Sequence, residues 1–532
     1  MNEKQPVYIL PENVSRTMGK DAQRNNILAA KVIADIVKTT LGPKGMDKML
    51  VDATGNIIIT NDGVTILQEM EIEHPAAKMM VEIAKTQEAE VGDGTTTAAL
   101  FAGKLLENAE KLLDKNVHPT IITKGYQLAT EKAIQILNEI SIPLNDSLLL
   151  EQIAHTAMTG KGAEGYKENL AQLIVKAVDQ VATGKKVDMD DIKIEKIKGE
   201  SVNESELIQG IVLSKERANS EMPQTIKEAK ILMIDSPLEL KNPETETKIS
   251  VSTPEQLESF LHAEENYLKD LTNKIISSGA NVVFCQKGID DVAQYYLAKA
   301  KIFACRRIPR SDMEKLARAT GGKIISNLAD LRIEDFGMAE IVEEIKKGED
   351  SMIYVRGCKN PKAVTIVIRG GTSHVLDEIE RAIKDGLGDV ASAVRSGKVV
   401  PGGGAIEIEV ARRLRLFAKT QGGRVQLAIE EFATSLESIP EALAENAGLD
   451  PLDILTELKK RHEAGLYTHG LNLFTDQIGD MLSAGIIEPM KVKTQAIQCA
   501  SEVASMILRI DDVLMSSGQK APPVDMGKYS EE

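Results

Sequence analysis

The stretch Val91–Leu100 packs two glycines, one carboxylate and three hydroxyls between two segments in which apolar residues recur at helical spacing. The stretch therefore marks the N-terminus of a helix. Unpaired N–H groups and the positive end of the helix dipole favour an anion there, and glycine lets a phosphate come close to the backbone. Asp93 would repel that phosphate unless a metal ion lay between them, and Mg²⁺ takes a carboxylate together with phosphate oxygens.

A purely structural interpretation of the same residues stays open. Gly92 can end the first helix while the threonines cap the second, as most clusters of this kind do. The stretch is not a Walker A loop, because no Lys-Ser/Thr pair follows the glycines and no strand leads into them. The choice between nucleotide binding and capping thus depends on the rest of the chain.

Composition limits the class of protein. The 532 residues, 42% of them hydrophobic, predict about three domains. The formal net charge of −16 argues against nucleic acid as a partner. No apolar run approaches the ~20 residues that span a bilayer and no signal sequence is present, so we expect a cytoplasmic protein without a membrane partner. The four cysteines lie far apart, which predicts neither a zinc site nor a disulfide framework.

Three turns in the first third of the chain carry charged residues or glycine. A helix predicted over 21–38 stops at Leu41–Gly45, and a strand predicted over 56–60 ends just before Asp62. A carboxylate in such a turn is usually only a cap or an Asx-turn. Lys161 stands between two glycines, which is typical of a flexible surface turn, but it could reach the terminal phosphate of a nearby nucleotide as a mobile point charge.

From about residue 214 to residue 369 short strands alternate with helices, which predicts a separate α/β domain. Strands are predicted at 230–234, 281–284, 301–304 and 323–325, and helices at 290–300 and 311–320, the second opened by a capping box of Ser311 and Glu314. An insertion from residue 237 to about 278 contains a helix with one apolar face, made by Leu257, Phe260, Leu261, Leu268, Leu271 and Ile275. That face either packs on the domain's own core or is available to a partner.

The last third of the chain is again helical. The periodicity from Leu376 to Val394 carries Asp385, and Val400–Ala405 then places three glycines at the start of another helix. These glycines permit close approach of a ligand to the backbone, or form a hinge, or do both. The candidate nucleotide motifs therefore lie at opposite ends of the sequence, and they must fold into one domain to cooperate.

Four motifs, taken together and in this order, resemble those of the chaperonins: Leu41–Leu50, Asn61–Leu67, Gly92–Thr97 and Val400–Ala405. The resemblance runs from about Val7 to Leu514. Within that family the chain is similar to the group II type, because the insertion at 237–278 matches the helical protrusion that serves as a built-in lid. The runs Ile487–Gln495 and Ile507–Val513 are similar to that group as well.

The resemblance implies a multidomain α and α/β fold. Residues 1–143 and 403–532 would form a largely helical equatorial ATPase domain, residues 144–213 and 370–402 a small intermediate hinge domain, and residues 214–369 an α/β apical domain that binds substrate. Subunits of this family, identical or related, form two back-to-back rings around a folding chamber. The implied partners are unfolded client proteins and further subunits, and the implied cofactors are ATP and Mg²⁺.

The resemblance also implies residue roles. Asp93 would hold Mg²⁺, while Asp62 and Asp385 would flank the attacking water, with hydrolysis tied to closure because Asp385 belongs to the hinge domain. The implied nucleotide-binding residues are Leu41, Gly42, Pro43, Gly94, Thr95, Thr96, Thr97, Lys161, Gly403 and Gly404, with Glu488 and Lys493 at the ribose and base end. The lid helix would offer Leu257, Phe260, Leu261 and Leu268 to clients and to neighbouring lids.

One position departs from the family pattern, which usually has Ala after the second aspartate. Here Gly386 follows it, and glycine weakens a helix by about 1 kcal/mol relative to Ala. The aspartate itself is present, so we expect activity. Two other functions are weighed: a bacterial-type chaperonin with a separate lid protein, against which the insertion argues, and a small-molecule kinase or simple ATPase, for which the sequence shows no second substrate pocket.

Overall fold

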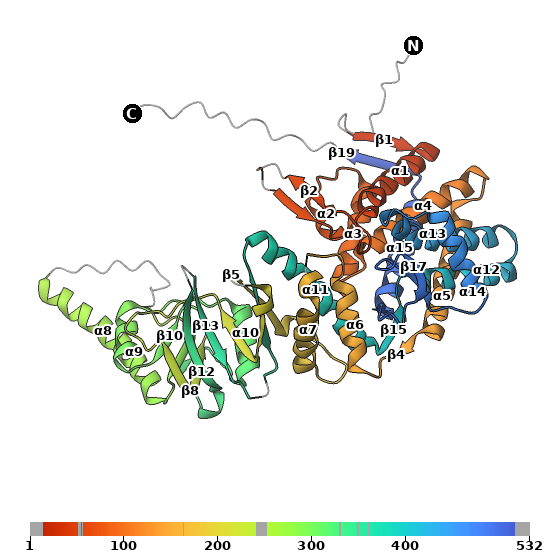
Figure 1. Cartoon of the computed structure of the whole chain (residues 1–532). Helices are drawn as coiled ribbons and strands as arrows, with labels where there is room; N and C mark the ends of the chain where they lie inside the picture. The colour runs from red at the N-terminus through yellow and green to blue at the C-terminus, as the bar shows by residue number, and fades with distance from the viewer. Residues whose placement is uncertain are drawn as a thin grey trace, which may run out of the picture. The chain divides into compact units, whose positions relative to one another are not determined.

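The computed structural model describes residues 14–516, apart from residues 52–54, 56, 163, 200, 241–252, 329–330, 348–349 and 360. The chain divides into two compact units (Figure 1). Unit 1 comprises Met1–Ile142 and Val399–Glu532, and unit 2 comprises Pro143–Lys398. The further division into an intermediate and an apical domain stays a prediction.

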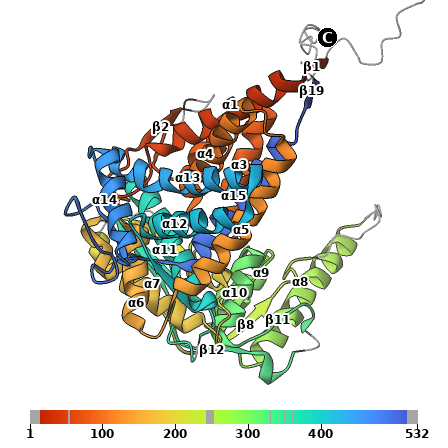
Figure 2. The same ribbon diagram turned by 90° about the vertical axis from the view of Figure 1, so that its right-hand side faces the viewer.

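Unit 1 is built mainly from helices of both terminal stretches. They are α1 (Gly19–Lys38), α2 (Gly63–Glu69), α3 (Pro75–Val91), α4 (Thr95–Asp114), α5 (Pro119–Ile140), α12 (Ala405–Gln421), α13 (Gly423–Asn446), α14 (Pro451–Glu463) and α15 (Met490–Leu508). Helix α4 packs against α1, α3, α13 and α15, and Figures 1 and 2 show α4, α13 and α15 together from two sides. The helix that begins at the glycine-threonine motif is thus central to unit 1.

Aromatic side chains from distant parts of the sequence meet in the core of unit 1. Phe101 of α4 and Phe432 of α13 pack edge to face with ring centroids 5.2 Å apart, and Tyr126 of α5 lies 5.6 Å from the same Phe432 ring. The Tyr126 hydroxyl donates to the Leu105 carbonyl at 2.7 Å, which satisfies its polar end. The core of unit 1 therefore requires both terminal stretches.

Small sheets connect the helices of unit 1. Antiparallel pairs are formed by β1 (Val14–Met18) with β19 (Asp512–Ser516), β2 (Lys48–Val51) with β3 (Ile57–Thr60), and β16 (His469–Asn472) with β17 (Gln477–Asp480). A three-stranded sheet has the order β18 (Ile487–Pro489), β15 (Lys398–Pro401) and β4 (Ile142–Pro143). The predicted strand at 56–60 is confirmed by β3.

Unit 2 has a helical part and a larger α/β part. The helical part packs α11 (Ser373–Ser396) against α6 (Ser147–Met158) and α7 (Lys167–Val181), beside a sheet of the order β5 (Ile192–Lys198), β14 (Val364–Gly370) and β6 (Glu206–Ile208). The α/β part has the strand order β10 (Phe303–Cys305), β9 (Val282–Cys285), β8 (Thr225–Ile234), β12 (Gly337–Lys347), β13 (Asp350–Arg356) and β7 (Gly210–Leu213), with β11 (Ile324–Ile325) paired to β8. Helices α8 (Pro254–Ser277), α9 (Asp291–Lys299) and α10 (Arg310–Thr320) accompany it.

Strands β8, β9, β10 and β11 confirm the four strands predicted for the α/β part, whereas β12 and β13 were not predicted. They pair antiparallel from Ile341 with Arg356 to Lys347 with Asp350, and β12 is rich in charged residues that obscure a strand pattern. The predicted capping box of α10 is wrong, because that helix begins at Arg310 with Pro309 as its N-cap. Ser311 then lies inside the first turn and cannot cap the helix.

The predicted lid helix is α8, but its apolar face is only partly described. The side chains of Leu257, Phe260 and Leu261 lie outside the described residues. Leu268 is 2% exposed and Ile275 is fully buried, so both pack within unit 2. This placement corrects the expectation that Leu268 is offered to clients, because its side chain already belongs to the core in this structure. Among the described residues no helix is both long enough and apolar enough to cross a membrane.

Candidate functional site

Two glycines shape the turn between α3 and α4. Gly92 (φ 85°) ends α3 and donates its N–H to the Glu88 carbonyl at 2.9 Å. Gly94 (φ 79°) is the N-cap of α4, and no side chain caps that helix. The interpretation that the threonines cap α4 is therefore wrong, since Thr95 is already its first residue. The first turn of α4 keeps the geometry that an anion requires.

The side chain of Gln87 hydrogen-bonds to this turn. This contact was not predicted from the sequence. The Gln87 side chain is fully buried, and Nε2 donates to the carbonyls of Asp93 at 2.9 Å and Val492 at 3.2 Å. A Cβ on Gly94 would lie 2.8 Å from Val492 Cγ1 and 3.0 Å from Gln87 Nε2. Gln87 thus connects the turn before α4 to the first turn of α15. The only signal in the sequence was one amide among the apolar positions of a helix.

Gly63, the residue after Asp62, lies directly against the threonines of α4. A Cβ on Gly63 would stand 2.4 Å from Thr96 Oγ1 and 3.2 Å from Thr95 Oγ1, so only glycine permits this approach. Asp62 is the N-cap of α2, and its Oδ2 accepts from Thr65 N at 3.0 Å and from Thr65 Oγ1 at 2.6 Å. The structural role considered for Asp62 is therefore real, since its carboxylate caps α2.

The turn Leu41–Pro43 is held by the end of α13. Asn446 Nδ2 donates to the carbonyls of Lys38 at 2.9 Å and Leu41 at 2.8 Å. Gly42 (φ 81°) packs so closely that its Cβ would lie 2.4 Å from Leu443 Cδ2 and 3.6 Å from Leu473 Cδ1. The turn Leu41–Pro43 therefore packs against Leu443, which precedes β16 in the chain, and Leu473, which follows it.

The triple glycine also packs against residues of β16. Gly403 (φ 63°) accepts a hydrogen bond from Leu471 N at 2.8 Å, and a Cβ on it would lie 2.7 Å from Leu471 O. Gly404 (φ 76°) is the N-cap of α12, and its Cβ would lie 2.6 Å from Pro440 Cβ. Within unit 1 these glycines let other parts of the chain approach the backbone closely, and the hinge interpretation stays open.

Two further predicted residues, Glu488 and Lys493, belong to one charge cluster in which Glu488 is partly exposed. Lys493 Nζ lies 2.9 Å from Glu407 Oε1 and 2.7 Å from Glu488 Oε2. Burial by itself would lower the pKa of Lys493, yet the two carboxylates raise it above its usual range. Burial raises the pKa of Glu488, Lys493 lowers it, and the charges of Glu407 and Asp93 raise it further, so the net shift is upward. Asp93 and Glu488 therefore belong to one electrostatic environment.

Lys161 and Asp385, which were also predicted as site residues, belong to unit 2. Lys161 Nζ and Asp385 Oδ2 form an ion pair of 2.5 Å, and Gly162 N donates to Glu378 Oε1 at 2.8 Å. Both contacts join the loop after α6 to α11. Lys384, the residue before Asp385, instead pairs with Glu380 at 2.8 Å.

The departure at Gly386 has a packing reason. A Cβ there would lie 2.8 Å from Ile174 Cδ1 and 3.7 Å from Met158 Cγ. Gly386 is buried where α11 packs against α6 and α7. The glycine thus accommodates close helix packing one residue after Asp385.

The donor set of unit 1 fits a magnesium nucleotide. Glycines at 63, 94 and 403 leave no room for a side chain, and the motif supplies hydroxyls and one carboxylate. No group of three or more His, Cys, Asp or Glu side chains suited to a metal occurs among the described residues. A single carboxylate suits Mg²⁺, which takes its other ligands from phosphates and water, and does not suit an all-protein metal cage.

Comparison with known proteins identifies the class to which this fold and site belong. Residues 33–517 match the TCP-1/cpn60 chaperonin family, and the chain belongs to that family. It is similar to the "Thermosome subunit beta" of Archaeoglobus fulgidus, with 57% identity covering 97% of this chain and 95% of the relative. The "Thermosome subunit" of Pyrococcus horikoshii is 55% identical over 99% of this chain and 97% of its own length.

A solved structure refines the class. The "Open state monomer of a group II chaperonin" from Methanococcoides burtonii matches with a TM-score of 0.60 and 47% identity, covering 79% of this chain and all of that one. The chain is a group II chaperonin subunit, an ATP-dependent chaperonin with a built-in lid, and its multidomain α and α/β fold is the predicted one. These relatives do not favour the bacterial-type alternative with a separate lid protein, or the kinase.

Proposed function

We propose that unit 1 binds ATP with Mg²⁺ and that the chain hydrolyses it to drive closure of a double-ring folding chamber. The observation that carries this proposal is the contact of Gly63 with Thr96, which places the Asp62 turn against the start of α4. Asp93 would hold the metal, and Gly94 with Thr95, Thr96 and Thr97 would bind the phosphates. Leu41, Gly42, Pro43, Gly403 and Gly404 would border the nucleotide, with Glu488 at the ribose.

The proposed chemistry is attack of water on the terminal phosphate. Asp62 would orient that water and accept its proton, since its carboxylate is held in place by Thr65. Bound Mg²⁺ would supply neutralisation of the phosphate charge. Asp385 is the second residue proposed to act on the water, and Lys161 is proposed to meet the terminal phosphate. Because both belong to unit 2, hydrolysis would depend on how the two units are arranged once ATP is bound.

The first test is phosphate release by the purified protein with and without Mg²⁺, together with electron microscopy. Double rings that hydrolyse ATP only with Mg²⁺ are expected. The cytoplasmic location stays a prediction, as do the partners, which would be unfolded clients and identical or related subunits. A stable monomer that phosphorylates a small molecule would overturn the proposal.

The proposed lid is tested by a deletion that leaves the buried part of α8 in place. Replacing residues 243–264 with a short Gly-Ser linker removes Leu257, Phe260 and Leu261 but keeps Leu268 and Ile275, which are buried in unit 2. We expect unchanged ATP turnover and loss of protease resistance when ATP and a transition-state mimic of phosphate are added. Encapsulation and refolding of a client by the deleted protein, without an added lid protein, would contradict this role.

A further inference from the structure

Glu407, Lys493 and Glu488 form a cluster in which one buried ammonium pairs with two carboxylates. The side chains of Lys493 and Glu407 are 8% and 4% exposed, that of Glu488 is 23% exposed, and the three formal charges sum to −1. Burying an ion pair commonly costs more in desolvation than it returns, and apolar replacements are often neutral or stabilising. Stability alone therefore does not explain a cluster with an excess carboxylate.

Each member of the cluster lies close, in sequence or in space, to a different part of the nucleotide motifs. Glu407 lies in the first turn of α12, directly after the triple glycine, where the helix dipole favours its charge. Glu488 Oε1 lies 3.0 Å from the position of a Cβ on Gly402. Lys493 follows Val492 in the chain. The Gln87 side chain donates hydrogen bonds to the backbone carbonyls of both Val492 and Asp93. The cluster thus connects the glycine stretch with the phosphate motif.

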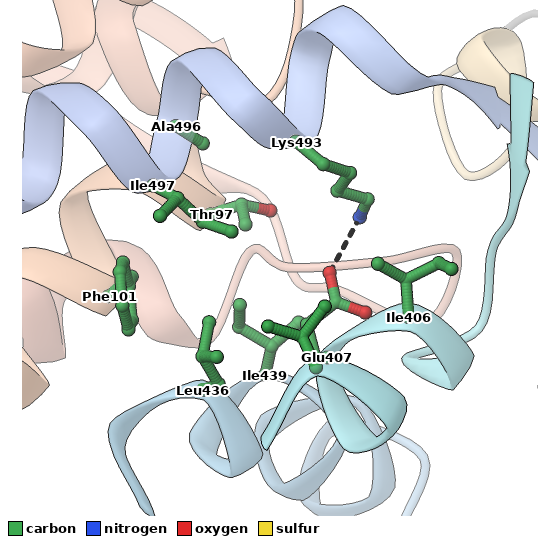
Figure 3. Close-up of a pocket in the computed structure, with 10 residues that line it drawn as sticks. Thr97, Phe101, Ile406, Glu407, Leu436, Ile439, Lys493, Ala496 and Ile497 are labelled. Atoms are coloured by element: carbon green, nitrogen blue, oxygen red, sulfur yellow. Dashed lines mark ion pairs between the residues drawn. The ribbon is translucent and has the colours of Figure 1, made fainter. Parts of the chain in front are cut away.

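The second oxygen of Glu407 is a further sign that this side chain serves more than packing. Glu407 Oε2 is buried without a hydrogen-bond partner among the described residues. Such an atom destabilises the fold unless something compensates for it. Glu407 lines a cavity of about 10 Å³, roughly the space of one water molecule. Figure 3 shows Glu407 reaching from α12 to Lys493, with Thr97 of α4 also lining the cavity.

We propose that Glu407 is a positioning residue for the ribose of the bound nucleotide. It holds Lys493 from one side, so that Lys493 holds the Glu488 carboxylate ready to accept hydrogen bonds from the ribose hydroxyls. The inference rests on the proposed function, in which Glu488 meets the ribose. Lys493, buried between two carboxylates, acts through Glu488 and does not itself contact the nucleotide. Without the charge of Glu407, the ammonium pairs with Glu488 alone and draws that carboxylate out of position.

The test compares the affinities of Mg²⁺-ADP and Mg²⁺-2′,3′-dideoxy-ADP for the assembled full-length protein by calorimetry, so that no hydrolysis intervenes. Wild type is expected to prefer ADP by about tenfold or more, the usual effect of a hydrogen bond to a charged group. Glu407→Gln should lose most of this preference through weaker ADP binding, with dideoxy-ADP affinity unchanged. Glu488→Gln should lose it too, and adding Glu407→Gln to that variant should change nothing further.

The matched control is Glu409→Gln. Glu409 is an equally buried carboxylate two residues along α12, but it binds Arg412, Arg413 and His462 instead of Lys493. This variant should keep the wild-type ribose preference, which separates positioning from general damage to the helix. Loss of the preference in Glu409→Gln to the same extent would overturn the inference.

Other outcomes are equally decisive. A wild-type ribose preference in Glu407→Gln, or additive effects of Glu407→Gln and Glu488→Gln, would overturn the role of Glu407. Wild type that binds neither nucleotide would instead overturn the proposed function. If Glu407→Gln does not assemble, Glu407→Asp keeps the charge on a shorter side chain. Its preference should fall partway, and an unchanged preference in that variant would also overturn the inference.

Discussion

The nucleotide motifs of unit 1 and the Lys161–Asp385 pair of unit 2 are held by different kinds of contact. In unit 1 the approaches are so close that a Cβ on Gly63, Gly94 or Gly403 would lie 2.4, 2.8 or 2.7 Å from its nearest neighbour. In unit 2 the pair joins side chains that are 20% and 19% exposed. The first arrangement is set by backbone packing, whereas the second includes an ion pair between partly exposed side chains.

This difference indicates how binding and turnover are divided. A packed backbone contact changes only if the local fold changes. An ion pair between partly exposed side chains can break without repacking of a backbone contact. Substitution of Asp93 or of the closely packed glycines of unit 1 should therefore weaken nucleotide binding, whereas substitution of Asp385 in unit 2 should slow hydrolysis and leave binding intact.

The largest effect is expected for Asp93→Ala. It removes the proposed protein ligand of Mg²⁺, so the affinity for Mg²⁺-ATP should fall by about 100-fold or more. Calorimetry with Mg²⁺-ATP measures the loss, and Glu90→Ala, which removes an exposed carboxylate at the end of α3, is the control that should bind normally. Unchanged affinity in Asp93→Ala would refute the assignment of the metal ligand.

Asp385→Ala tests the other half of the comparison. ATP affinity should stay within about twofold, while hydrolysis slows by about 100-fold, as expected on losing a positioned acid-base group. Asp377→Ala is the matched control, since Asp377 lies on the same helix but pairs with Lys196 at 2.7 Å. A wild-type rate in Asp385→Ala would mean that another residue orients the water.

Asp62→Asn separates capping from chemistry in unit 1. The amide oxygen of Asn can still accept from Thr65, so the cap of α2 is kept while the charge is lost. Hydrolysis should slow by about 100-fold with little change in stability. A thermal melt beside the rate measurement checks both statements, and a variant that hydrolyses normally would leave Asp62 with its structural role alone.

Alanine at two glycines tests the packing contrast directly. Gly403→Ala places a Cβ 2.7 Å from the Leu471 carbonyl at a positive φ, so ATP affinity should fall by about tenfold through local strain. Gly386→Ala places a Cβ against the flexible end of Ile174 and in ordinary contact with Met158, and the gain of about 1 kcal/mol in helix propensity offsets that crowding. Its stability should change by less than about 1 kcal/mol. An equal loss of function in both variants would remove the distinction between the units.

The smallest functional effect is expected from Glu409, which supports unit 1 without touching the motifs. Burial would raise its pKa, but hydrogen bonds from His462, Arg412 and Arg413 lower it from 4.5 to about 2. The resulting stability is present above pH 4.5 and is lost as the pH falls from 4.5 towards 2. Thermal melts should show Glu409→Gln several degrees less stable at pH 7, with the gap closing below pH 4.5. A gap that widens in acid would contradict this.

Local patterns in the sequence predicted much of the fold and part of the site. The glycines at 42, 92, 94, 403 and 404, which the sequence placed at turns and helix ends, all have positive φ. Strands β8 to β11 followed from short apolar runs. The antiparallel pair β12 and β13 did not, because its charged residues conceal the alternation on which a strand prediction depends.

Only the tertiary structure decided which side chains support the motifs. Gln87 and Glu407 look like ordinary helix residues, yet each is buried against a residue of α15 more than 80 positions away. The same holds for Gly386, where a helix-weakening residue is explained by the side chains of two other helices. A sequence determines turn geometry and helix ends through local sterics and hydrogen bonding. Burial, charge pairing and close packing depend on partners that only the folded chain brings together.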